Sequence, residues 1–163
     1  KVSIFLIISV LVIFFSAVHY KVEIKKVIIL DIPKGSNTSF ISDNLSKNKI
    51  IHNSALFKFY ARIISSDQKF KAGEYKFESS QSIDSVVTKL VEADFFYRKI
   101  TLLPVSTISN ILQLGNSQGL VNDLANEPEM VLYKLGINIQ EGIFYPDTFY
   151  YLKGETFSSV LLK

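Results

Sequence analysis

The feature that most constrains this chain is an apolar stretch near its start, VSIFLIISVLVIFFSAV, residues 2–18. Fourteen of these seventeen residues are apolar and the other three are serines. As a helix the stretch covers about 25 Å, close to the thickness of a bilayer core. The alternative is a cleaved signal peptide, but the apolar region of such a peptide is normally about 7–15 residues long. Because Ser16-Ala17-Val18-His19 is also a poor cleavage site, we expect an uncleaved transmembrane anchor over residues 1–20.

The charges beside this stretch bear on its orientation. Lys21, Lys25 and Lys26 follow it, whereas Lys1 precedes it. By the positive-inside rule this local count weakly favours a cytoplasmic location for the rest of the chain. The sequence does not begin with Met, so further cytoplasmic residues can precede Lys1. The charge count alone therefore leaves the orientation open.

The composition argues against several classes of function. A net charge of +3, from 18 basic and 15 acidic residues without a Lys/Arg-rich block, argues against a nucleic-acid partner. The absence of cysteine removes disulfides, zinc thiolates and thiol nucleophiles together. His19 and His52 lie far apart in the sequence, so we expect no metal site and no cofactor.

The chain after the anchor predicts a small α+β arrangement of short strands and helices. We expect strands at residues 27–32, 73–77 and 98–103, where proline and glycine bound β-branched and aromatic residues. Helices are expected from Ser36–Thr38, from Asn53 or Ser54, from Ser82, and from Ser106 or Thr107. Their spacing predicts these inward residues: Phe40, Ile41 and Leu45; Leu56, Phe57, Tyr60 and Ile64; Ile83, Val86, Val87, Leu90 and Val91; Ile108, Ile111 and Leu112. Residues 115–119 are expected to form a loop, and residues 120–135 a further helix.

Four segments in this order carry a family resemblance: IPKGSNTSFISDNLSKNKII (32–51), LFKFYARI (56–63), KAGEYKF (71–77) and EGIFYPDTFYYLKG (141–154). They resemble the YceG-like endolytic murein transglycosylases (the MltG family), single-pass proteins of the bacterial inner membrane. The last segment, which joins Glu-Gly to Pro-Asp-Thr-aromatic, is the specific one. The resemblance implies a LysM-like α+β domain over residues 21–97 and the start of a mixed α/β catalytic domain over 98–163. It also implies that most of the chain is periplasmic.

The sequence departs from the family pattern in two places. Pro104-Val105-Ser106 stands where members commonly carry Pro-Glu-Gly after the strand. The family also continues past the equivalent of Lys163, with a second acidic helix segment and further polar motifs that complete the catalytic cleft. We therefore expect this chain to be the front part of such a protein, and to be inactive by itself.

The resemblance implies that Glu141 is the general acid and then the general base of a lytic transglycosylase. The enzyme would cleave the MurNAc–GlcNAc β-1,4 bond of nascent glycan strands and leave 1,6-anhydro-MurNAc ends. Hydrolysing glycosidases need two carboxyl groups. Here the 6-hydroxyl of the muramic sugar replaces water, so one carboxyl group suffices. It must be protonated near neutral pH, which requires a pKa raised by apolar neighbours such as Ile143, Phe144 and Tyr145.

The residues around Glu141 have expected supporting roles. Gly142 would let the backbone approach a bulky glycan closely. Asp147, after Pro146, fits a turn position whose carboxylate binds nearby backbone amides, and Thr148 would join that turn. Tyr145 could stack on a sugar face, although such aromatic residues more often belong to a core or a cleft wall.

The implied partners are peptidoglycan glycan strands and penicillin-binding proteins of the synthesis machinery. The main alternative is an anchored, non-enzymatic module whose LysM-like part binds peptidoglycan. A third hypothesis is a membrane scaffold that docks another protein through residues 27–95.

Overall fold

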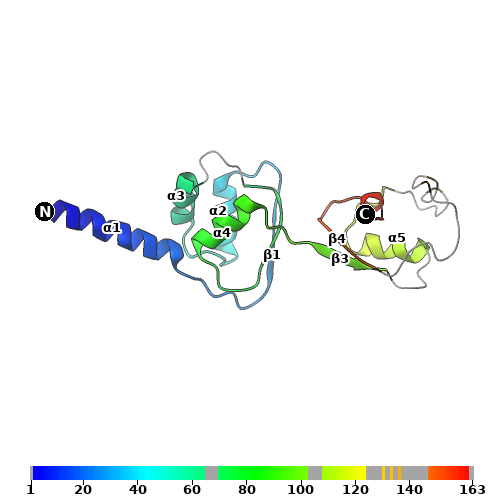
Figure 1. Ribbon diagram of the computed structural model, residues 1–163, viewed down its shortest axis with the longest axis horizontal. Coiled ribbons are helices and arrows are strands. Elements are labelled where there is room, and N and C mark those ends of the chain that lie inside the picture. The colour runs from blue at the N-terminus through cyan, green and yellow to red at the C-terminus, as the bar shows by residue number, and fades with distance from the viewer. Residues whose placement is uncertain are drawn as a thin grey trace. The chain divides into compact units, whose positions relative to one another are not determined.

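The computed structural model describes residues 2–64, 70–102, 108–123, 130, 133, 136 and 147–161. The chain divides into two compact units, Lys1–Phe96 (unit 1) and Tyr97–Lys163 (unit 2). The expected boundary, between residues 97 and 98, is one residue away. Unit 1 contains α1 (Val2–His19), β1 (Ile28–Ile32), α2 (Thr38–Lys47), α3 (Ser54–Ile64), β2 (Gly73–Phe77) and α4 (Ile83–Glu92). Unit 2 contains β3 (Arg98–Thr101), α5 (Ile108–Ser117), β4 (Thr148–Tyr151) and α7 (Phe157–Leu161) (Figure 1).

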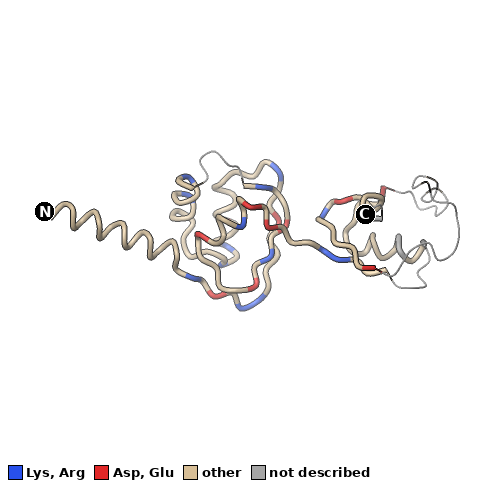
Figure 2. Tube along the Cα trace, viewed as in Figure 1, with Lys and Arg blue, Asp and Glu red and all other residues tan. Residues whose placement is uncertain are grey.

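Helix α1 is long and apolar enough to cross a membrane. Its 18 residues have a mean hydropathy of 2.6, and only 6% of the segment is buried within the protein. Figure 2 shows that no charged residue interrupts the helix. An apolar helix that is exposed nearly all round is typical of a membrane span rather than of a core helix. The expected mixed α+β fold with an apolar N-terminal helix is therefore confirmed.

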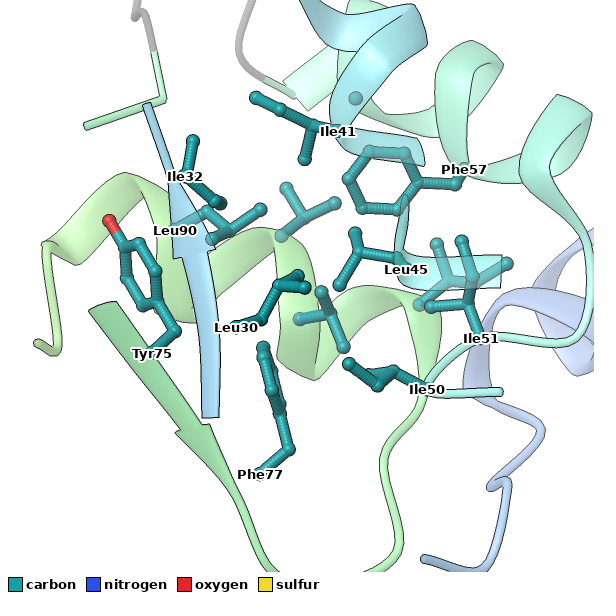
Figure 3. Packing of buried hydrophobic residues seen from close by; sticks show 14 of the residues in the cluster. Leu30, Ile32, Ile41, Leu45, Ile50, Ile51, Phe57, Tyr75, Phe77 and Leu90 are labelled. Carbon is teal, nitrogen blue, oxygen red and sulfur yellow. The ribbon is translucent and has the colours of Figure 1, made fainter. Parts of the chain in front are cut away.

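Unit 1 is built on a two-stranded antiparallel sheet. Strands β1 and β2 pair from Ile28 opposite Phe77 to Ile32 opposite Gly73, although α2 and α3 separate them in the sequence. Figure 3 shows side chains from this sheet and from the helices converging on one core. The core residues are Val18, Leu30, Ile32, Ile41, Leu45, Ile50, Ile51, Phe57, Ala61, Tyr75, Phe77, Ile83, Val86, Val87 and Leu90.

Three side chains cap the helices of unit 1 where the sequence predicts a helix start. Asn37 Oδ1 accepts a hydrogen bond from the Phe40 amide (2.8 Å), and Asn53 Oδ1 accepts one from the Leu56 amide (2.9 Å). At α4 the cap is reciprocal. Ser82 Oγ accepts from the Ser85 amide, and Ser85 Oγ from the Ser82 amide. Each cap satisfies a backbone donor that the helix itself leaves unpaired, and a cap is worth about 1 kcal/mol.

Two residues expected on inward helix faces are exposed instead. Phe40 is 48% exposed and Ile64 is 56% exposed. On α2 the buried residues are Ile41 and Leu45, so Phe40 lies at the edge of the buried face. Ile64 is the last residue of α3, one turn beyond the buried Ala61, where the core ends.

Unit 2 is built around a second small antiparallel pair. Strands β3 and β4 pair from Arg98 opposite Tyr151 to Thr101 opposite Thr148. Its core consists of Ile100, Leu102, Leu120, Tyr151, Phe157 and Val160, with Leu114 and Phe149 packed against it. An isolated parallel bridge joins Val121 to Thr156.

The sequence-based elements of unit 2 need two corrections. Residues 115–117 belong to α5 and not to a loop, because Gly115 lies where the helix packs against the ring of Phe157. Residues 120–123 are not helical, since Val121 bridges to Thr156 instead. The expected helix start at Ser106 or Thr107 lies outside the described residues.

Candidate active site

The structure describes only two of the five candidate site residues. Glu141, Gly142 and Tyr145 lie outside the described residues, as do Ile143, Phe144 and Pro146. Asp147 and Thr148 are described, at the point where the chain enters β4. The roles expected for all five candidate residues stay predictions.

The entry into β4 is fixed by contacts to the end of β3. The Leu102 amide donates to the carbonyl oxygen of Asp147 (2.9 Å). One residue later, the hydroxyl groups of Thr101 and Thr148 lie 3.0 Å apart and share a hydrogen bond. These bonds extend the β3–β4 ladder to Asp147. Asp147 follows Glu141 by six positions, so covalent geometry keeps the two within about 20 Å.

The Asp147 side chain is exposed and bound to the backbone amide of the next residue. Its Oδ1 accepts a hydrogen bond from the Thr148 amide at 2.7 Å. This local contact is typical of Asp at the start of a turn or strand. It holds the carboxylate at the end of the β3–β4 pair, on the protein surface.

The aromatic residues of β4 point to different environments. Tyr151 is fully buried, and its hydroxyl lies 3.2 Å from the carbonyl oxygen of Gln118, to which it donates. Arg98 Nη1 donates to the same carbonyl oxygen, also at 3.2 Å. Tyr150, by contrast, is 59% exposed, because successive side chains of a strand alternate between faces. Tyr150 is thus a solvent-exposed aromatic ring within the segment 141–154.

The strand β4 itself was not predicted from the sequence. The available signal was the run Thr148-Phe149-Tyr150-Tyr151, one β-branched and three aromatic residues ahead of Gly154. Such a run is typical of a strand. These four residues belong both to the segment 141–154 and to β4, so they have a structural role as well.

A second carboxylate, Asp123, was not singled out from the sequence. Its Oδ1 accepts from the Ser158 amide (3.1 Å), and its Oδ2 accepts from the Ser158 hydroxyl. Partial burial raises the pKa of Asp123, but the hydrogen bonds from Ser158 outweigh burial and leave the pKa below its usual value. An acid held ionised in this way stabilises the start of α7 and is unsuited to donate a proton at neutral pH.

The third described carboxylate of unit 2, Glu155, also binds backbone. Its Oε1 accepts from the Leu152 amide at 3.2 Å, across the turn after β4. Within the described part of unit 2, every carboxylate (Asp123, Asp147 and Glu155) thus accepts a hydrogen bond from a backbone amide. In that same part of the chain, no three His, Asp or Glu side chains gather as a metal site would require.

Comparison with known proteins gives one family match. The model of the YceG-like family matches residues 30–163, which include the whole EGIFYPDTFYYLKG segment. A crystal structure of a YceG-like protein from Listeria monocytogenes matches with 24% sequence identity and a TM-score of 0.41. The match covers 85% of this chain and 53% of that protein, so the chain spans about half the length of the Listeria protein. A search among curated proteins finds no match.

Proposed function

The chain belongs to the YceG-like family, and from this premise we propose that it is the front part of a membrane-anchored endolytic lytic transglycosylase of peptidoglycan. The observation that carries the proposal is the family match over residues 30–163, because it includes the motif with Glu141. The substrate is the β-1,4 bond between MurNAc and GlcNAc in a nascent glycan strand. The products carry 1,6-anhydro-MurNAc ends.

In the proposed reaction Glu141 acts twice. Its carboxyl proton passes to the glycosidic oxygen as the bond to the anomeric carbon of MurNAc breaks. The 6-hydroxyl of the same sugar then bonds to that carbon, and the Glu141 carboxylate takes the hydroxyl proton. The carboxyl group returns to its starting state, and no water is consumed. General acid–base catalysis of this kind contributes about 10²–10⁴-fold in rate.

The described carboxylates of unit 2 support the choice of Glu141. A general acid needs a proton to give, whereas the hydrogen bonds from Ser158 hold the pKa of Asp123 below its usual value. The carboxylates of Asp147 and Glu155 are each bound to a backbone amide. Asp147 suits a different task. As the last residue before β4, it would orient the segment that leads back to Glu141.

The surroundings of β4 suggest how a glycan could be held. The exposed ring of Tyr150 offers a flat apolar face, and pyranose rings have apolar faces that complement aromatic rings. Gly142 and Tyr145 would lie along the same segment, close to the sugar. In unit 1, the LysM-like domain proposed for residues 21–97 would bind the glycan away from the reacting bond.

The apolar helix α1 supports anchorage in a membrane. From the family resemblance we propose that this is the bacterial inner membrane, with residues 21–163 on the periplasmic side. This location gives access to glycan strands as they are made. Penicillin-binding proteins of the synthesis machinery are the protein partners that we propose.

The proposal is tested with the full-length protein that contains this chain, reconstituted in bilayer nanodiscs and supplied with purified glycan strands. We expect cleavage that leaves anhydro ends, detected by mass spectrometry, and a loss of about 10²–10⁴-fold in Glu141→Gln. Glu92→Gln is the matched control, because it makes the same chemical change at an exposed residue that ends α4. Equal cleavage by Glu141→Gln would remove Glu141 from the mechanism. Glycan binding without cleavage by the unmodified protein would favour the non-enzymatic binding module.

A further inference from the structure

Helix α3 is apolar on the side that faces away from its core. Its inward residues, Phe57 and Ala61, are buried. On the outward side, Phe59 and Ile63 are four residues apart and 56% and 55% exposed, and Ile64 beside them is 56% exposed. A surface helix of a water-soluble domain normally carries polar residues on its outward face. We call Phe59, Ile63 and Ile64 the outer face of α3.

This outer face adjoins the membrane-spanning candidate, α1. The ring of Phe14 on α1 meets the ring of Phe59 edge-on, with centroids 5.6 Å apart, and lies 6.5 Å from the ring of Tyr60. One turn later, Val18 of α1 is buried in the core of unit 1. Figure 1 shows α3 on the side of unit 1 where α1 enters, and β1 on the opposite side. The last turn of α1 is therefore packed against the domain.

The polar boundary at the end of α1 sets the depth of this contact. The apolar run ends at Val18, and His19, Tyr20 and Lys21 follow. Tyr20 is 62% exposed and packs edge-on against the ring of His52, as expected for an aromatic residue at a membrane surface. Phe14 precedes Tyr20 by six residues, or about 9 Å along a helix. A side chain that contacts Phe14 therefore lies about 9 Å from the polar residues at the end of α1, on the membrane side.

Basic residues lie near the same boundary. Arg62 is exposed between Ile63 and the buried Ala61. Lys58, one turn before it, is half-buried and forms an ion pair with Asp43 (3.2 Å). Lys21 and Lys25 are exposed just after α1. An apolar helix face flanked by basic side chains is typical of a helix that lies in the interface of an anionic bilayer.

From these contacts we infer that α3 is an interfacial membrane helix, whose outer face inserts among lipids beside α1 and seats unit 1 directly on the bilayer. The partner of this surface is the acyl-chain and headgroup region of a bilayer, at a depth of about 5–10 Å. The inference rests on the membrane anchorage proposed for α1. It adds that the first domain is fixed at the membrane surface and not suspended from the anchor by a linker.

The test uses spin labels on single-cysteine variants, and residues 1–163 contain no cysteine that would have to be removed first. The labelled variants are Ile8→Cys in the middle of α1, Ile63→Cys on the outer face of α3, and Ile29→Cys on β1. Ile29 is the matched control, because it is also an exposed isoleucine of unit 1 (46%) but lies on the side away from α1. The protein is reconstituted in nanodiscs of phosphatidylethanolamine and phosphatidylglycerol. Accessibility to oxygen, which concentrates in lipid, is compared with accessibility to a water-soluble nickel chelate.

We expect the oxygen-to-nickel ratio to be highest at position 8, several-fold lower at position 63, and lowest, again by several-fold, at position 29. A ratio at position 63 equal to that at position 29, with position 8 in lipid, would overturn the interfacial helix and leave the anchor intact. A low ratio at position 8 would contradict the anchor and the interfacial helix together. Because the glycan-cleavage assay of Glu141→Gln is read separately, neither result can be confused with a failure of the proposed chemistry.

Discussion

The packing of Gly115 against Phe157 gives a sharp prediction about unit 2, the unit that holds β4. A Cβ atom added at Gly115 would lie 2.1 Å from Cε2 and 2.5 Å from Cδ2 of the Phe157 ring. That ring is only 2% exposed, and it belongs to the core that also contains Tyr151 of β4. The clash is therefore with a buried ring that has little room to move.

Two opposing contributions set the change in the free energy of unfolding caused by Gly115→Ala. Alanine in a helix interior is favoured over glycine by about 1 kcal/mol. Overpacking of a filled core costs about 1–3 kcal/mol, and an overlap of more than 1 Å belongs at the upper end. The expected net destabilisation is about 2 kcal/mol, or about a 30-fold larger open population. A propensity argument alone predicts the opposite sign.

The assay is hydrogen exchange followed by mass spectrometry, because it reports on unit 2 separately from unit 1. We expect faster exchange in α5 and β4 of Gly115→Ala, with α4 unchanged. The change Asn116→Ala, at an exposed neighbour in the same helix, is the control and should leave exchange in β4 unchanged. Combining Gly115→Ala with Phe157→Leu, which removes the ring atom of closest approach, should be less harmful than the sum of the two single changes. Slower exchange in Gly115→Ala would refute the packing argument.

Three further predictions concern hydrogen bonds. Ser82→Ala should destabilise α4 by about 1 kcal/mol in the same exchange assay, because it removes the reciprocal cap. The control Ser80→Ala should have little effect on α4. Equal effects of the two changes would contradict the cap. Because the pKa of Asp123 is lowered, its bond to the start of α7 should contribute stability above pH about 4 and lose it as pH falls through the folded pKa. Asp123→Asn should abolish that step in an NMR titration of the α7 amides, and an unchanged step would assign it to another group. Tyr151→Phe should lower the free energy of unfolding, measured by denaturant, by only about 0.5–1 kcal/mol. The carbonyl oxygen of Gln118 loses the Tyr151 hydroxyl as a donor but keeps Arg98. A loss above about 3 kcal/mol would contradict that reasoning.

The sequence predicted unit 1 well because its signals are local. Helices α2, α3 and α4 each begin at a side chain that can bind free backbone amides, and Asn37, Asn53 and Ser82 do so in the structure. The spacing of Ile83, Val86, Val87 and Leu90 placed one face of α4 in the core, and all four are buried. Ile64 was placed inward by the same spacing and is exposed, because periodicity does not show where the core ends.

Unit 2 was harder to predict because its key contacts join distant residues. Gly115 resembles a helix end in the sequence, and only the ring of Phe157, 42 residues later, explains a glycine inside α5. The pairing of Thr148 with Thr101 likewise depends on a partner 47 residues away. The candidate acid, Glu141, was identified by resemblance to a family. Composition and spacing alone do not distinguish it from a surface glutamate.

In the proposed reaction a glycan strand is cut by its own 6-hydroxyl group with the help of Glu141. The most direct measurement is to digest glycan strands with the full-length protein in water enriched in ¹⁸O and to weigh the new ends. We expect 1,6-anhydro ends that contain no ¹⁸O. New reducing ends that carry ¹⁸O would show that water attacks the sugar, and would contradict attack by the 6-hydroxyl group.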